Sequence, residues 1–259
     1  MLLDSWEASA GWEASECEAR TAVPDVAGHG GEMTLGVSVL EEFRAKVGRD
    51  DIARHLAGFG ALAGYDASSR RLADVTGGHV DLAVEDHRVA LIVWLRAWGC
   101  RHLRRTDTAR TAEALRTWWE AWGARLPGQQ AALTVLSEAE LTVAGQAYEA
   151  LRTAQAAGRN VKGREVHVTF GDTAAAKAMF AIRPRSFLPW DEPIRLAFGR
   201  PGGGDAYVKL LRLSAAALDG LAWRLAVPVS ELPAILGRPE SPPPKLVDEY
   251  LWIRITRGL

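Results

Sequence analysis

The segment FGDTAAAKAMFAIRPRSFLPWDEPIRLAFG, residues 170–199, carries the most informative pattern in the chain. Gly171 is typical of a tight turn, and the alanine-rich run after it predicts a helix over residues 173–182. A loop containing proline and an apolar approach then lead to Asp191, which with Pro193 predicts the start of a second helix. Gly199 predicts its end. The segment therefore predicts two helices joined by a loop that delivers one carboxylate.

Helical periodicity dominates the rest of the chain from Thr34 onward. Residues Ser137 and Glu140 form a capping-box pattern at the start of one helix, and EVHVTF (165–170) is the one clearly alternating stretch. Apolar faces predict two early helices, through Leu35, Val39, Leu40 and Phe43 and through Ile52, Leu56, Phe59 and Leu62. Further helices are predicted over 81–105, 109–126, 141–157, 205–225 and 245–257, with a short turn at 230–236. The fold class is therefore all-α, with about ten helices.

The charge of the chain is unevenly distributed. The whole chain has a formal net charge of −1, but residues 1–32 hold seven acidic residues and one basic residue. We expect 1–32 to be a disordered acidic tail and 33–259 to be the helical domain. A purine-rich codon run ahead of Met33 raises a second possibility, that Met33 is the native start. The body is mildly basic, which fits a nucleic-acid partner without requiring one.

Composition excludes several classes of protein. Two cysteines are too few for a disulfide framework, a four-thiolate zinc site or a cysteine-ligated cluster, and the histidines show no ligand spacing. We therefore expect no metal and no small-molecule cofactor. The longest apolar run, residues 89–95, is too short to cross a bilayer, and the acidic first residues lack the basic region of a signal peptide. We expect a cytoplasmic, monomeric protein without a membrane partner.

Asp191 has two interpretations on its residues alone. As a helix N-cap it would contribute about 1 kcal/mol of stability. As a catalytic carboxylate it would stabilise the positive charge that develops on a sugar when a C1′–N bond breaks, and it would orient or deprotonate the attacking water. The neighbouring Phe187 and Trp190 would line its pocket and keep it apolar. Both interpretations can hold together.

Residues 170–199 resemble the core of the helix-hairpin-helix DNA glycosylase superfamily, in which a hairpin glycine opens an alanine-rich helix and an aspartate follows about twenty residues later. The resemblance places Gly171 near the second hairpin glycine and Asp191 on the catalytic aspartate. It implies two helical lobes around a helix-hairpin-helix-like core, with a cleft between them. Asp172 and Thr173 stand where some members have a lysine that forms a Schiff base, which implies a monofunctional enzyme.

Other residues are candidates for contact with DNA or with an extruded base. The DNA-binding candidates are Gly171, Asp172, Thr173, Arg183, Arg185 and Arg195. Lys177 would contact a phosphate or pair with Asp191, or else lie on the surface as a solvated lysine. Trp118 and Trp122 share a helix face and would either fill the core or stack on a base. The Gly202–Gly204 run is interpreted as a connector rather than a phosphate loop.

The leading hypothesis is a DNA glycosylase that flips a damaged or modified base out of the duplex and excises it by hydrolysis. The alternative is a non-catalytic helical module of the same fold that binds DNA or a protein partner. A third possibility, an unrelated helical scaffold, applies if Asp191 is only a cap. The sequence names neither the base nor the role, which would be repair or defence against phage DNA.

Overall fold

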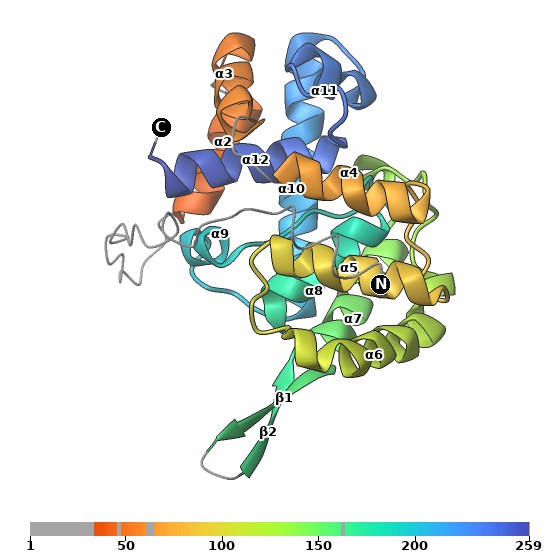
Figure 1. The fold of residues 1–259 in the computed structure, drawn as a ribbon. Coiled ribbons are helices and arrows are strands. Elements are labelled where there is room, and N and C mark those ends of the chain that lie inside the picture. Colours follow the sequence, from red (N-terminus) through yellow and green to blue (C-terminus); the bar gives the residue numbers. More distant parts are fainter. Residues whose placement is uncertain (1–33, 46–47, 61–64, 162–163, 259) are drawn as a thin grey trace. The chain divides into compact units, whose positions relative to one another are not determined.

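A computed structural model describes residues 34–45, 48–60, 65–161 and 164–258 (Figure 1), and the predicted acidic tail lies outside them. These residues are mostly helical, as predicted, with one two-stranded hairpin. The α-helices are α2 (Leu35–Ala45), α3 (Arg49–Gly60), α4 (Tyr65–Thr76), α5 (Glu85–Ala97), α6 (Thr108–Trp122), α7 (Glu138–Thr153), α8 (Gly171–Ile182), α9 (Glu192–Ala197), α10 (Gly204–Leu225), α11 (Leu232–Ile235) and α12 (Pro243–Thr256). The strands are β1 (Gln155–Val161) and β2 (Arg164–Thr169), and the short 3-10 turns are η2 (Arg105–Asp107), η3 (Gly123–Arg125), η4 (Leu133–Val135) and η5 (Val229–Glu231).

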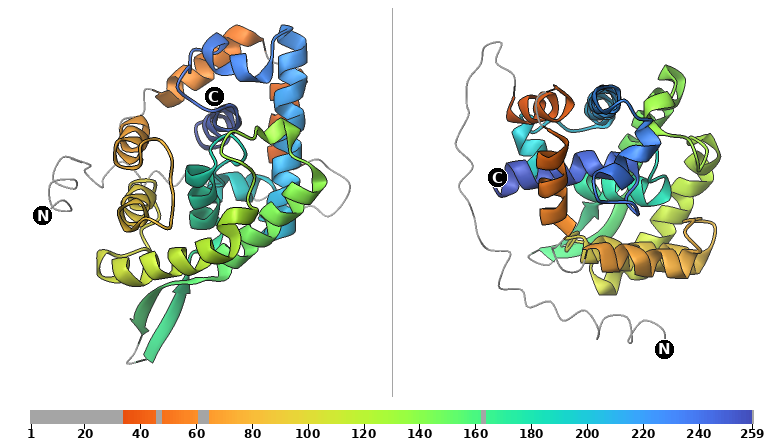
Figure 2. Two further views of the ribbon diagram at one scale, coloured as in Figure 1. Left: turned by 90° about the vertical axis from the view of Figure 1, so that its right-hand side faces the viewer. Right: turned by 90° about the horizontal axis from the view of Figure 1, so that it is seen from above.

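The first and last described helices pack together. Helix α2 lies along α10, and α12 contacts α2, α3 and α10 (Figures 1 and 2). An ion pair joins Arg254 to Glu42 at 2.9 Å, and Arg224 donates to the carbonyl of Phe43 at 3.0 Å. The predicted apolar faces of α2 and α3 are buried, except that Leu35 is exposed and Leu62 lies outside the described residues.

Helix α8 is buried on all sides, because it consists almost entirely of small and apolar residues. Ala174, Ala175, Ala176 and Ala178 are all fully buried. The helix packs against α5 on one side and α7 on another. Short side chains allow such close approach from several directions, so α8 forms the centre around which the middle helices gather.

Two predicted helices end earlier than expected. The helix predicted over 81–105 ends at Ala97, because Gly99 adopts a left-handed conformation with φ +86°. The amide of Cys100 then donates to the carbonyl of Leu95 at 3.0 Å, which closes the last turn. Helix α7 begins with the predicted capping box of Ser137 and Glu140 but ends at Thr153 rather than at 157. The residues that follow join a strand instead.

That strand, β1, pairs with β2 in an antiparallel hairpin. The alternating stretch at 165–170 is thus a strand, as predicted, and its partner is a segment for which helix and loop were predicted. Ala157 lies opposite Val168, with an irregularity in the register between 155 and 157. The hairpin base packs on α6, where Thr111 donates to the carbonyl of Ala156 at 2.7 Å. Figures 1 and 2 show the hairpin extending beyond α6.

No helix among the described residues is long and apolar enough to cross a membrane.

Candidate functional site

The loop between α8 and α9 brings Lys177 and Asp191 together. The ammonium of Lys177 lies 2.5 Å from a carboxylate oxygen of Asp191, and it also donates to the carbonyl of Trp98. The lysine is 3% exposed, whereas a quarter of the Asp191 side chain is exposed. Burial, the largest single influence, would lower the pKa of Lys177, but the charge and hydrogen bond of Asp191, together with Cys100 and Asp248, outweigh burial and raise that pKa. The pairing alternative for Lys177 is therefore confirmed, and the surface alternative is wrong.

Asp191 occupies the N-cap position of α9, but its carboxylate makes no cap hydrogen bond with the described residues. Its backbone carbonyl accepts the first helical bond, from the amide of Arg195 at 2.9 Å. The side chain is directed to Lys177 instead. Asp191 therefore starts the helix only through its backbone, because its carboxylate contacts Lys177 and does not cap the helix.

A second buried ion pair lies close to the first. Lys245 and Asp248, one turn apart on α12, are joined to each other, and the ammonium of Lys245 is 4.7 Å from the ring centre of Trp98. Burial raises the pKa of Asp248 to about 6, and the negative charge of Asp191 adds to this. One oxygen of Asp248 has no hydrogen-bond partner among the described residues. Lys245 and Asp248 were not among the predicted site residues, although a Lys and an Asp three residues apart within a predicted helix are a pattern typical of an ion pair.

A cavity of about 450 Å³ adjoins these pairs. It is bounded by α4, α5, the C-terminal end of α8 and residues 237–249. The rings of Trp94 and Trp98 lie 4.3 Å apart, and Phe180 packs beside both. Trp98 and Lys245 line the cavity and also contact the ion pairs, whereas neither Lys177 nor Asp191 is among its described lining residues. The cavity and the Lys177–Asp191 pair are therefore neighbours that share a wall.

The predicted aromatic pocket residues have different positions. Phe187 and Trp190 are fully buried beside Asp191, as the apolar approach predicts, but they pack in the core and do not line the described cavity. Trp118 is buried and donates to the carbonyl of Ala147 at 2.8 Å. Trp122, half-buried, stacks with Arg125 at 4.4 Å. These two tryptophans fill the core around α6, and no described contact joins them to Asp191.

Two of the three predicted DNA-binding arginines, Arg183 and Arg195, make side-chain contacts within the protein, whereas the Nε of Arg185 is buried without a hydrogen-bond partner among the described residues. Arg183 is buried and donates to the carbonyl of Pro127 at 2.7 Å and to Gln129. Burial also lowers its pKa. Arg185 is half-buried, and its Nε is covered. Arg183 therefore cannot contact a phosphate without breaking its internal bonds, because a guanidinium satisfied by carbonyls is part of the core.

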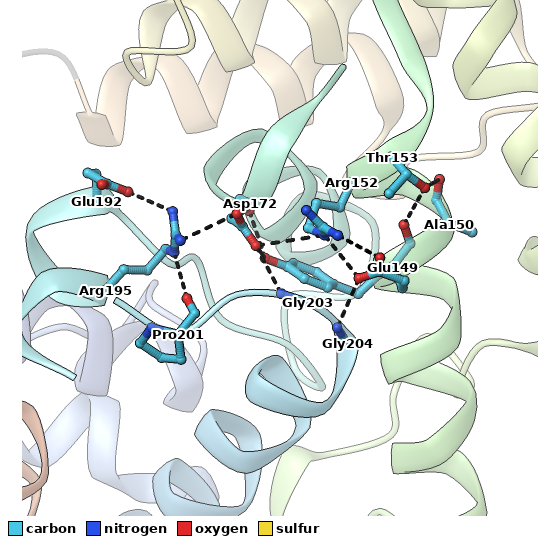
Figure 3. A network of polar contacts seen from close by, with 11 residues as sticks. Glu149, Ala150, Arg152, Thr153, Asp172, Glu192, Arg195, Pro201, Gly203 and Gly204 are labelled. Atoms are coloured by element: carbon cyan, nitrogen blue, oxygen red, sulfur yellow. Dashed lines mark hydrogen bonds and ion pairs between the residues drawn. The ribbon is translucent and has the colours of Figure 1, made fainter. Parts of the chain in front are cut away.

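Arg195 and Asp172 belong to a polar network that joins α7, α8, α9 and the start of α10 (Figure 3). Arg195 lies 3.4 Å from Asp172 and 2.6 Å from Glu192. Because Asp172 is on α8 and Arg195 is on α9, this network fixes the two helices that carry Lys177 and Asp191. The predicted contact residues Arg195 and Asp172 thus act within the protein.

The glycine run before α10 is closed by carboxylates from other helices. The amide of Gly203 donates to Asp172 at 3.2 Å, and that of Gly204 donates to Glu149 at 3.1 Å (Figure 3). These two amides are the donors that would otherwise bind a phosphate at a helix N-terminus. Two acids already occupy them, which agrees with the connector interpretation.

Gly171 marks the junction between β2 and α8. It adopts φ +69°, a conformation that favours glycine, as the predicted tight turn requires. Thr173 is half-buried in the first turn of α8. The element before Gly171 is a strand, whereas a helix-hairpin-helix motif has a helix there. The turn is thus where it was predicted, but it is entered from a hairpin.

Comparison with known proteins found no matching family model, no significantly similar curated protein and no significantly similar solved structure.

Proposed function

We propose that the chain is a monofunctional DNA glycosylase-like enzyme of helix-hairpin-helix type, which hydrolyses the bond between a damaged or modified base and its sugar. The observation that carries the proposal is the position of the Asp191 carboxylate. It lies at the end of a buried apolar approach, a quarter of it remains exposed, and the helix that it begins does not use it as a side-chain cap.

The chemistry needs one carboxylate and one water molecule. As the C1′–N bond breaks, its electron pair leaves with the base and positive charge develops on the sugar, where a nearby carboxylate stabilises it. The water oxygen then bonds to C1′. Asp191 accepts the proton that this water loses, and the proton finally neutralises the departing base. Phe187 and Trp190 make one side of this carboxylate apolar, which strengthens its electrostatic effect.

Lys177 is a positioning residue in this proposal. Its raised pKa keeps the ammonium charged at neutral pH, and its short contact holds the carboxylate in one orientation. The carbonyl of Trp98 holds the ammonium in turn. Arg195 and Asp172 fix α9 against α8, so that the two partners approach each other from rigid helices.

The aromatic cavity is the proposed site of the extruded base. Trp94, Trp98 and Phe180 offer ring faces for stacking, and Lys245 offers a hydrogen-bond donor on the side of the ion pairs. The cavity lies between the α4–α5–α8 group and the segment that leads into α12. This supports the two-lobed arrangement with a cleft that the resemblance implies.

One observation favours the alternative of a non-catalytic module. The negative charge of Asp191 is already paired with Lys177, and the described cavity does not reach the carboxylate. A fold that kept this pair for stability alone would bind DNA without releasing a base.

Base release by the Asp191→Asn variant separates the two candidates. Wild type and variant are incubated with genomic and phage DNAs of varied base modification, and released bases are identified by mass spectrometry. Loss of the charge should slow release by about a hundredfold or more, whereas Asp50→Asn, a matched change at an exposed side chain, should have no effect. Circular dichroism confirms that each variant is folded. Release at the wild-type rate from Asp191→Asn would contradict the catalytic assignment.

A further inference from the structure

A group of exposed arginines lies on the segment between α5 and α6 and on the hairpin. We call it the arginine surface, and it consists of Arg101, Arg104, Arg105, Arg110, Arg159 and Arg164, all exposed. Four of these guanidinium groups make no ion pair within the described residues, namely those of Arg101, Arg104, Arg159 and Arg164. The basic run at 101–105 was predicted to be the end of a helix over 81–105, but α5 ends at Ala97, before that run.

The two parts of this surface are joined by direct contacts. The hairpin base packs on η2 and α6, and the amide of Gly158 donates to Asp107 at 3.4 Å. A ring nitrogen of His102 lies 3.0 Å from the carbonyl of Phe170, which places the segment beside the turn at Gly171. The 101–107 segment and the base of the hairpin therefore lie beside the junction at which α8 begins.

The protein holds the backbone of the segment rigidly. Arg96 of α5 donates to the carbonyls of Leu103 and Arg104, each at 2.6 Å, and to the hydroxyl of Thr108 at 2.7 Å. A buried leucine, Leu103, anchors the same turn in the core. Because this backbone is fixed, the exposed side chains on either side of Leu103 emerge from a preformed surface, which lowers the entropic cost of binding.

The hairpin carries its two arginines on one face. Arg159 lies opposite Val166, and Arg164 lies opposite Val161. Because residues two apart on a strand share a face, both arginines and Val166 are on the same side of the ribbon. Val166 is 45% exposed. This face of the ribbon therefore presents an apolar side chain beside two arginines, and no other described helix or strand covers that side chain.

We propose that the arginine surface binds double-stranded DNA, with the hairpin in a groove and the 101–110 segment on the phosphates. A two-stranded ribbon has the width of the major groove, and clustered exposed arginines neutralise phosphates. Residues 101–110 and 155–169 contain six arginines and two acidic residues, Asp107 and Glu165, so the charge of these two segments complements a polyanion. The choice of DNA as the polyanion rests on the proposed function, but the surface does not include Asp191.

The test measures binding of the full chain to a fluorescent 20-base-pair duplex by anisotropy, over a range of salt concentrations. The test variants are Arg101→Glu/Arg104→Glu and Arg159→Glu/Arg164→Glu. The matched control is Arg49→Glu/Arg54→Glu, which reverses two exposed arginines on α3. Each test variant should bind about tenfold more weakly or worse, and the slope of log affinity against log salt should decrease by about 2.

The control should stay within about twofold of wild type at the same salt, because its charges lie away from the surface. Equal weakening by control and test variants, or no weakening at all, would overturn the proposal. Equal affinity for single-stranded DNA or heparin would overturn the assignment to a duplex. If a glutamate variant misfolds, Arg159→Gln/Arg164→Gln on the exposed hairpin gives the same comparison.

Failure of this proposal can be distinguished from failure of the proposed function. Asp191→Asn should keep wild-type affinity and lose base release. The arginine variants should release bases at the wild-type maximal rate with a raised KM. If the protein binds the duplex through the arginine surface but releases no base from any DNA, the binding proposal stands and the proposed glycosylase activity is wrong.

Discussion

Asp191→Asn tests whether the carboxylate is a partner of Lys177 or a helix cap. A pure cap would retain most of its hydrogen bonding as asparagine, and the free energy of unfolding would fall by no more than about 1 kcal/mol. The structure predicts a larger loss. The ammonium of Lys177 is 3% exposed, and in the variant it would keep the carbonyl of Trp98 but lose its anion.

Breaking a buried ion pair by removing one partner typically costs about 3–5 kcal/mol. We expect about 3 kcal/mol here, the lower end of that range, because a quarter of the Asp191 side chain stays in contact with solvent. Urea unfolding followed by circular dichroism measures the change. Glu138→Gln, which breaks an exposed ion pair with Arg212, is the control and should leave the midpoint unchanged.

The single variant Lys177→Met and the double variant Lys177→Met/Asp191→Asn complete a double-mutant cycle. Because the double variant removes both charges, it should be more stable than Asp191→Asn alone. The pH dependence gives a further check. The pKa of Lys177 is raised in the wild type, so its contribution persists at neutral pH and is lost only as pH rises through that raised pKa. In Asp191→Asn, burial becomes the main influence on the pKa of Lys177, so the buried amine can become neutral. The difference in the free energy of unfolding between wild type and variant should therefore narrow as pH rises from about 7 toward 10.

A loss of no more than about 1 kcal/mol from Asp191→Asn, with additive effects in the double variant, would falsify this reasoning.

Two other predictions concern stability. Gly204→Ala would place a methyl group 2.4 Å from the carbonyl oxygen of Gly145, so α7 and α10 must separate and the free energy of unfolding should fall by about 2 kcal/mol. The control is Gly128→Ala, where a Cβ meets no atom within 4 Å. Equal midpoints of urea unfolding for the two variants would contradict the prediction. The raised pKa of Asp248, about 6 against an ordinary 3.8, means that the folded state binds this proton more tightly. The free energy of unfolding should therefore fall as pH rises from 3.8 to 6. Unfolding curves measured over a pH series should show a smaller fall in Asp248→Asn. An equal fall in wild type and variant would mean that other groups cause it.

Local signals were sufficient for much of the fold. The capping box of Ser137 and Glu140 depends on neighbours three residues apart, and the structure confirms it. The left-handed Gly99 was harder to foresee, because the apolar periodicity continues past it. Residues 155–157 gained a strand only through pairing with 164–169, an interaction that a local pattern of alanine and glutamine does not encode.

Part of the candidate site was also predictable from residues close together in the sequence. Lys177 and Asp191 lie fourteen residues apart in one informative segment, so their pairing could be considered. Lys245, Asp248 and the cavity wall come from helices distant in sequence. Arg183 shows the converse error, since a charged residue in a loop was expected to contact DNA and instead donates to the carbonyl of Pro127 inside the protein. Burial depends on tertiary packing that composition alone does not give.

The packing of α2 and α3 against α10 and α12 has a consequence for synthesis on the ribosome. The ring of Phe43 on α2 packs against that of Tyr250, 207 residues later in the chain. At roughly 5–20 residues per second, this partner emerges about 10–40 seconds after α2. During that interval the nascent chain exposes an apolar face that nothing yet made can cover. We therefore expect the apolar face of α2 to be fully covered only after α12 has left the exit tunnel.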